Sequence, residues 1–179
     1  GSAAPLPEDW SRHGDRETLI QYARMFSFPQ IDIVKLVEAT SEFWEYPMCD
    51  RDPLPFWSKG RATLLGDAAH PLYPTGSNGA GQAILDADCL ASCLAAVPDI
   101  AAALVAYEHE RLPATAEIVR RNRIGGPETV IDVVEERAPQ GFDDIDRVLS
   151  YIERKRIVED YATTARFSIA DVNQAILRS

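Results

Sequence analysis

Residues 60–87 read GRATLLGDAAHPLYPTGSNGAGQAILDA, and this stretch constrains the fold more than any other part of the chain. Its apolar run ends at Gly66 and Asp67, a loop of prolines and glycines follows, and a helix of small residues begins near Ala80. The start of a helix leaves backbone N–H groups unpaired and carries a partial positive charge. Glycines let the backbone approach a ligand closely. The order of strand, acid, loop and helix start therefore predicts a site for a polar or anionic ligand.

The same stretch also has a plainer interpretation. It can be an ordinary connection between a strand and a helix, in which the glycines make turns and the aspartate is a solvated cap. The stretch contains neither the GxGxxG pattern nor the Walker pattern of nucleotide-binding loops. On residue pattern alone, both interpretations stay open.

Charge and cysteine usage exclude several classes of partner. The formal net charge of −10 argues against nucleic acid and anionic membranes, which both favour a basic surface. No apolar run approaches the roughly 18 residues that span a bilayer. The three histidines lack a ligand spacing, and Cys49, Cys89 and Cys93 form no CxxC pair, so we predict no metal site. Cys89 and Cys93 lie one helical turn apart, as small buried thiols often do. We expect a cytoplasmic protein.

Hydrophobic periodicity predicts a chain dominated by helices. Short strands are expected at residues 43–48 and 61–67, and Pro113 is expected to kink or end a helix. The two or three strands are too few to form a stable sheet alone, so the pattern indicates part of a larger α/β structure. Helices are expected at residues 16–26, from 29 onward, at 80–97, from 100 to Pro113, and at 114–123, 128–136, 144–160 and after 170.

Residues 60–95, GRATLLGDAAHPLYPTGSNGAGQAILDADCLASCLA, closely resemble the second FAD-binding motif of the class A flavin-dependent aromatic monooxygenases. The upstream DRDPLPFW and the downstream YEHERLPATAEIVRRNRIGGPETVIDVVEERAPQGF resemble the branch that contains phenazine- and salicylate-type hydroxylases. The resemblance covers residues 43–142. It implies an α/β fold of the FAD/NAD(P)-binding, aromatic hydroxylase type, present here as a mostly helical fragment with two or three short strands.

The resemblance also implies roles for individual residues. Asp67, after Gly66, would hold a hydroxyl of the FAD ribityl chain, and Pro74 would lie beside the isoalloxazine ring. Backbone N–H groups would face the N1–C2=O edge of the flavin, and the helix start would stabilise negative charge on the reduced ring. These groups belong to Gly76, Ser77, Asn78, Gly79 and Ala80.

Other polar and aromatic residues are expected to have structural roles. His70 is interpreted as a structural member of the motif rather than a catalyst. Asp86 and Asp88 are interpreted as solvated helix positions. Aromatic residues in the first part of the chain can line a pocket, although such stripes are more often core; they are Tyr22, Phe26, Phe28, Phe43, Trp44 and Tyr46.

The function implied by the resemblance is hydroxylation of a small aromatic substrate. NAD(P)H would reduce FAD, and dioxygen would react through a flavin hydroperoxide, so the chemistry belongs to the cofactor and no catalytic side chain or metal is expected. Two alternatives stay open. One is a flavin-dependent reductase or epoxidase of the same fold, and the other is a non-catalytic helical module that serves assembly.

The chain departs from the family pattern because the GxGxxG element that binds the ADP half of FAD is absent from it. We expect residues 1–58 to be the end of a substrate domain, 59–142 the C-terminal part of an FAD-binding domain, and 143–179 C-terminal helices. The isolated chain is expected to bind FAD weakly or not at all and to be inactive. It is also expected to associate with itself, or with a chain that supplies the missing nucleotide-binding half.

Overall fold

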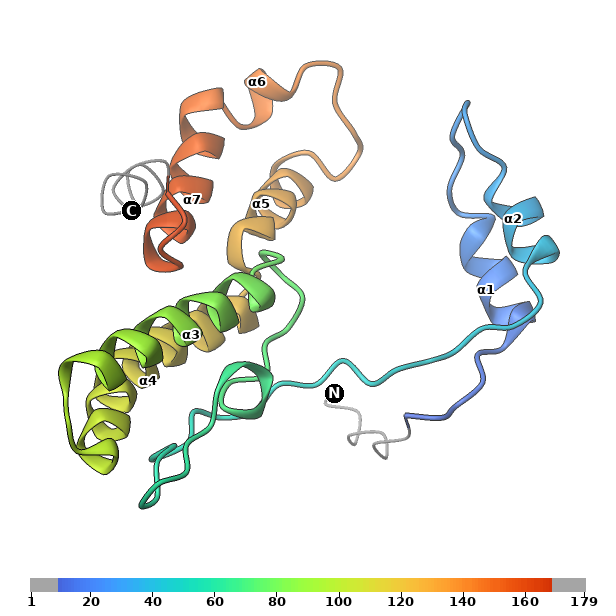
Figure 1. Ribbon diagram of the computed structural model, residues 1–179. Coiled ribbons are helices and arrows are strands. Elements are labelled where there is room, and N and C mark those ends of the chain that lie inside the picture. Colours follow the sequence, from blue (N-terminus) through green and yellow to red (C-terminus); the bar gives the residue numbers. More distant parts are fainter. Residues whose placement is uncertain (1–9, 169–179) are drawn as a thin grey trace. The chain divides into compact units, whose positions relative to one another are not determined.

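The computed structural model describes residues 10–168 and divides into two compact units, Gly1–Met48 and Cys49–Ser179. In the first unit, helices α1 (Arg16–Ala23) and α2 (Ile33–Ala39) pack against each other (Figure 1). Each begins at an aspartate whose carboxylate accepts a backbone N–H of the first turn: Asp15 from Thr18 at 2.8 Å, and Asp32 from Lys35 at 3.0 Å.

The second unit is built around an antiparallel pair of long helices. Asp99 caps the second of these, as its position predicts, by accepting the N–H of Ala102 at 2.8 Å. Short helices then fold back toward the end of that helix (Figure 1). The elements in chain order are η1 (Gly66–Ala68), α3 (Gly79–Ala96), α4 (Ile100–Arg123), η2 (Gly126–Glu128), α5 (Thr129–Arg137), α6 (Ile145–Val148) and α7 (Tyr151–Thr164).

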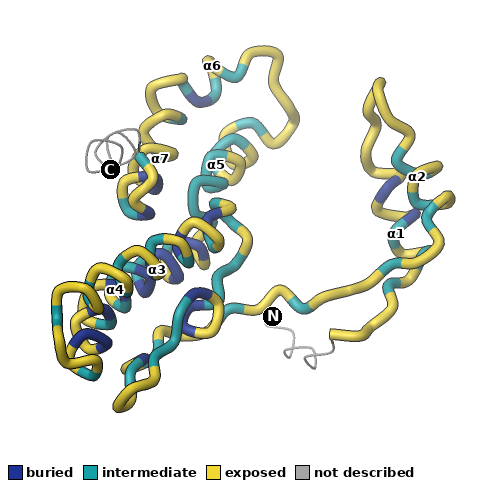
Figure 2. The backbone as a smooth tube through the Cα atoms, viewed as in Figure 1, coloured by how far each residue is buried: buried dark blue, intermediate teal, exposed yellow. Residues whose placement is uncertain are grey.

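Buried residues gather where α3 and α4 face each other (Figure 2). Trp57, Ala69 and Tyr107 form the centre of one apolar cluster, and Cys89 and Cys93 of α3 pack against it. No disulfide forms among the three cysteines. Burial, with added repulsion from Glu110 and Cys93, raises the pKa of Cys89 to about 12. This thiol therefore stays protonated and packs as a small apolar group, as predicted.

The expected strands at residues 43–48 and 61–67 do not form. Within residues 10–168 there are only isolated bridges, such as His13 with Trp44 and Lys59 with Ala62. An extended segment becomes a strand only when a neighbouring segment accepts and donates its backbone hydrogen bonds, and the described residues supply no such neighbour. The last two residues of the predicted second strand turn instead into η1.

Several helix boundaries also differ from the prediction. Helix α1 ends at Ala23 rather than at residue 26, and α2 begins at Ile33, after its Asp32 cap, rather than near residue 29. Helix α4 continues through Pro113, which lies on the exposed face, where water can satisfy the carbonyl that loses its partner. The predicted helix 144–160 is broken because Leu149 is extended and buried, and Ser150 then starts α7 with a capping box completed by Glu153. The helix predicted after residue 170 lies outside the described residues.

The aromatic residues of the first unit contribute little to its core. Ile20 and Ala23 are its buried apolar side chains among the described residues, and Phe43 is half-buried. Five other aromatic side chains of this unit are between 46% and 61% exposed: Tyr22, Phe26, Phe28, Trp44 and Tyr46. The expectation that they form core is therefore wrong.

Candidate functional site

The turn at Gly66 presents Asp67 to solvent. Gly66 has a φ of +59°, which favours glycine, and a Cβ there would lie 3.2 Å from the Cβ of Ala83 on α3. Its N–H donates to the buried carboxylate of Asp86 at 3.0 Å, which fixes the turn against α3. The side chain of Asp67 is exposed, and no hydrogen bond holds it among the described residues. Its carboxylate is therefore available to a ligand hydroxyl.

The anchor beneath this turn is Asp86, which is fully buried, so its interpretation as a solvated position is wrong. One carboxylate oxygen accepts from Nε2 of His70 at 2.6 Å, and the other accepts from Nε of Arg111 at 2.7 Å. Arg111, itself 1% exposed, also donates to Oε1 of Gln82 at 2.7 Å. Asp88 is exposed, as predicted. The cluster of His70, Gln82, Asp86 and Arg111 thus joins η1, α3 and α4 with matched charges.

Burial of Asp86 opposes its ionisation, but hydrogen bonds from His70, Arg111 and the N–H of Gly66 outweigh burial and lower the pKa of this carboxyl. Its charge therefore stabilises the fold fully above the ordinary carboxyl pKa of about 3.9, and that stabilisation is lost as pH falls through the lower folded-state pKa. We expect the free energy of unfolding to fall more steeply between about pH 4 and pH 2 in the wild type than in Asp86→Asn. Urea titrations across this range measure both slopes, and Asp88→Asn should keep the wild-type slope.

The loop that precedes α3 has an unusual backbone. Gly76 has a φ of +77° and Ser77 a φ of +48°, the latter a conformation that residues other than glycine seldom adopt. The N–H of Ser77 donates to the carbonyl of Pro74 at 2.9 Å, and the N–H of Gly76 donates to both carboxylate oxygens of Glu128, at 2.9 and 3.0 Å. Two of the loop amides that the resemblance assigns to the flavin are therefore engaged within the protein.

The first turn of α3 has free backbone donors and open space beside it. Asn78 occupies the N-cap position, but its side chain makes no capping hydrogen bond. A Cβ built on Gly79 or on Gly81 would meet nothing within 4 Å. The N–H groups of this turn are therefore uncapped, and within residues 10–168 there is open space beside the Cβ positions of the two glycines. A helix start of this kind favours an anionic or polar acceptor.

Asn78 instead turns its side chain into the protein. Its Nδ2 donates to the hydroxyl of Tyr161 at 2.8 Å, and that hydroxyl donates to Oδ1 of Asn122 at 2.7 Å. Nδ2 of Asn122 then donates to the carbonyl of Tyr73 at 3.1 Å. Sequence reasoning missed Tyr161 and Asn122, since no local pattern signals a contact between residues so far apart along the chain.

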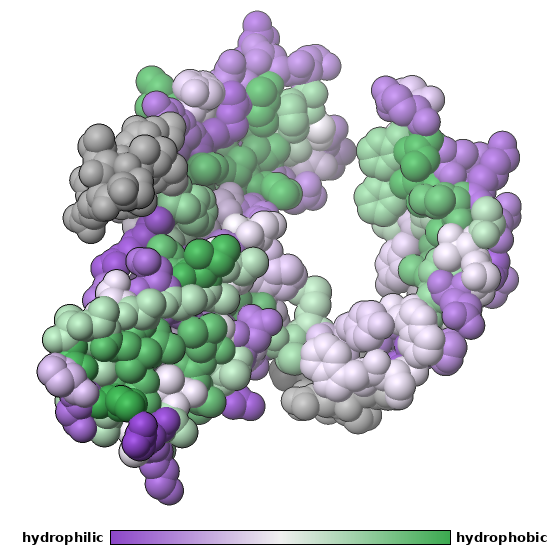
Figure 3. Space-filling model, in the orientation of Figure 1, coloured by the Kyte–Doolittle hydropathy of each residue, from purple (hydrophilic) through white to green (hydrophobic). Residues whose placement is uncertain are grey.

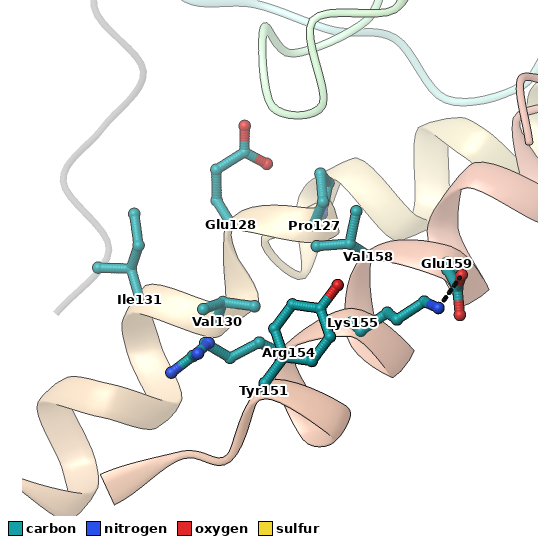
Figure 4. Close-up of a pocket in the computed structure, with 9 residues that line it drawn as sticks. All are labelled: Pro127, Glu128, Val130, Ile131, Tyr151, Arg154, Lys155, Val158 and Glu159. Carbon is teal, nitrogen blue, oxygen red and sulfur yellow. Dashed lines mark ion pairs between the residues drawn. The ribbon is translucent and has the colours of Figure 1, made fainter. Parts of the chain in front are cut away.

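A separate groove of about 600 Å³ lies between α7 and the segment formed by η2 and α5 (Figure 4). Its two cations are already paired, Arg154 with Asp146 and Lys155 with Glu159. In Figure 4 the carboxylate of Glu128 points away from the side chain of Tyr151, and it is bound to Gly76. The groove therefore offers no unpaired cation to select an acidic substrate.

Within residues 10–168, no group of three or more histidine, cysteine or acidic side chains could hold a metal ion. No helix there is both long enough and apolar enough to cross a bilayer.

Comparison with known proteins gives concordant matches. The model of a family described as FAD binding domain matches residues 44–122. The chain is 48% identical over 114 residues to phenazine 1,6-dicarboxylic acid hydroxylase from Lysobacter antibioticus, a match that covers 64% of this chain and 28% of that protein. It is 37% identical over 171 residues to 3-amino-4-hydroxybenzoate 2-monooxygenase from Streptomyces platensis, covering 93% of this chain and 39% of that protein.

A solved structure matches nearly the whole chain. The crystal structure of Klebsiella pneumoniae HpxO, complexed with FAD and uric acid, has a TM-score of 0.58 and 25% sequence identity. The match covers 93% of this chain and 42% of that one. The chain thus spans less than half the length of each of these three proteins, and its fold resembles part of that FAD-complexed structure.

Proposed function

We infer that this chain is the C-terminal part of a class A FAD-dependent aromatic monooxygenase, and we propose that the whole protein hydroxylates a small aromatic substrate. One observation carries the proposal: the uncapped first turn of α3, with open space at Gly79 and Gly81, follows a turn that presents the exposed Asp67. The family match covers this same segment.

In the proposed site, Asp67 accepts a hydrogen bond from a ribityl hydroxyl. The backbone N–H groups of Gly79 and Ala80 donate to the N1–C2=O edge of the flavin, and the partial positive charge of the helix start favours negative charge there. Gly76, Ser77 and Asn78 shape the loop, and Pro74 lies at its exposed edge. Bound FAD would supply the redox chemistry with dioxygen. NAD(P)H as the reductant follows the resemblance and remains a prediction, and so does the cytoplasmic location.

An apolar surface on the long helices is consistent with a missing neighbour. Figure 3 shows hydrophobic residues gathered over α3 and α4. The exposed apolar side chains of these two helices include Ile84 at 70%, Val105 at 59% and Leu94 at 44%. Soluble proteins seldom leave contiguous apolar surface uncovered unless another surface binds it. We propose that this face packs against the nucleotide-binding half, supplied by the same protein or by another chain, and otherwise promotes self-association.

A chimera tests the proposed function. In it, this chain replaces the 171 matched residues of the Streptomyces platensis monooxygenase. We expect the purified chimera to retain flavin absorbance and to consume oxygen faster when 3-amino-4-hydroxybenzoate is added. Asp67→Ala should weaken FAD binding about tenfold, because it removes a charged hydrogen-bond acceptor. Fluorescence titration of the apo-chimera with FAD measures this change.

Asp88→Ala is the matched control, since Asp88 is also exposed but lies away from the turn, on α3. It should leave FAD affinity unchanged. A folded chimera that binds no FAD would contradict the proposed site, as would equal FAD affinities for the two alanine variants.

A further inference from the structure

The conformation of the loop at residues 73–78 depends on contacts with other parts of the protein. Ser77 lies in the left-handed region, which costs a residue other than glycine conformational free energy that surrounding contacts must offset. Within the loop, the backbone N–H of Ser77 donates to the carbonyl of Pro74 at 2.9 Å. Two further hydrogen bonds join the loop to α4 and η2. Thr75 Oγ1 donates to the carbonyl of Asn122 at 3.1 Å, and the Gly76 N–H donates to Glu128.

Tyr161 packs against this loop and hydrogen-bonds with Asn78 and Asn122. It is 3% exposed, and its ring packs with Ile118, Ala165 and Leu72. A Cβ on Gly76 would lie 2.3 Å from its hydroxyl oxygen, so the ring sits directly against the loop backbone. Tyr161 belongs to α7, which the sequence pattern did not connect with the site.

The hydrogen bonds of the Tyr161 hydroxyl have a fixed direction. Because Nδ2 of Asn122 donates to the carbonyl of Tyr73, Oδ1 of Asn122 faces the hydroxyl and must accept from it. The hydroxyl in turn accepts from Nδ2 of Asn78. One hydroxyl therefore links the residue before α3 to the end of α4, and phenylalanine could keep the ring but neither hydrogen bond.

We propose that Tyr161 is a positioning residue for the flavin, acting from the C-terminal helix through Asn78 and Gly76. It fixes the N-cap of α3, and so aims the first-turn N–H groups at the cofactor edge. Gln82 supports the same arrangement, because its Nε2 donates to the carbonyl of Ala165 at the end of α7 at 2.7 Å. This inference rests on the proposed function for its ligand, but the contacts themselves do not depend on any ligand.

Tyr161→Phe tests the proposal, with Tyr151→Phe as the matched control on the exposed side of the same helix. In the 179-residue chain without FAD, we expect amide hydrogen exchange at Gly76 and Ser77, whose N–H groups are hydrogen-bonded within the protein, to become about tenfold faster in Tyr161→Phe. Exchange in the middle of α3 and α4 should be unchanged, and Tyr151→Phe should match the wild type. In the chimera, Tyr161→Phe should weaken FAD binding and shift the absorbance maximum of the bound flavin.

The outcomes separate this inference from the proposed function. Unchanged exchange at Gly76 and Ser77, or faster exchange throughout α3 and α4, would overturn the positioning role. A loosened loop with unchanged FAD affinity and spectrum would overturn it too, while leaving the proposed function intact. If even the unmodified chimera bound no FAD, the proposed function would be contradicted. The flavin would then also be excluded as the group that Tyr161 positions.

Discussion

Replacing Asp86 with alanine is expected to lower the free energy of unfolding by about 3–5 kcal/mol, because it strands a buried positive charge. Arg111 is 1% exposed, and Asp86 is its only carboxylate partner among the described residues. The same change removes the acceptor for His70 and for the N–H of Gly66. Urea unfolding followed by circular dichroism measures the loss.

Asp88→Ala is the control for this prediction, because it removes the same charge from an exposed position two residues along α3. Its effect should stay within about 0.5 kcal/mol. Adding Arg111→Leu to Asp86→Ala should recover part of the loss, since the stranded charge is then gone. Equal destabilisation by the two single aspartate variants would show that the buried cluster does not anchor the turn.

The local architecture of the site could be predicted from its sequence. Asp99 marks the start of α4, and the glycines and prolines of residues 66–80 mark a loop that leads into a helix. Such features depend on a few neighbouring residues, because capping and left-handed turns are satisfied within one or two turns of chain. The resemblance to the second FAD-binding motif rests on this same local segment.

The supports of the site could not be predicted in this way. Asp86 and Asp88 look alike in sequence, and only the fold brings Arg111, 25 residues away, against the first of them. Tyr161 meets Asn78 across 83 residues, so no periodicity reveals their contact. Likewise, the two expected strands depended on hydrogen-bonding neighbours that residues 10–168 do not supply. Long-range partners, rather than local propensity, decide these features.

Gly76→Ala is expected to lower the free energy of unfolding by about 1–3 kcal/mol, and to weaken FAD binding by the chimera at least as much as Tyr161→Phe does. Alanine at this position would have to adopt a φ of +77°, and its Cβ would overlap the Tyr161 hydroxyl oxygen. Either the loop or α7 must therefore move. Both the hydrogen bond to Glu128 and the N-cap of α3 would shift with it. Urea unfolding and FAD titration measure the two effects.

Gly81→Ala separates damage to the fold from obstruction of the cofactor. Gly81 lies in the first turn of α3 with ordinary helical backbone and open space beside it, so alanine should raise the free energy of unfolding by about 0.5–1 kcal/mol. The same methyl group would enter the space proposed for the flavin, so FAD binding should weaken although the fold is more stable. Gly76→Ala acts through the loop and Gly81→Ala through the ligand space. Unchanged FAD affinity in Gly81→Ala would place the flavin away from this helix start.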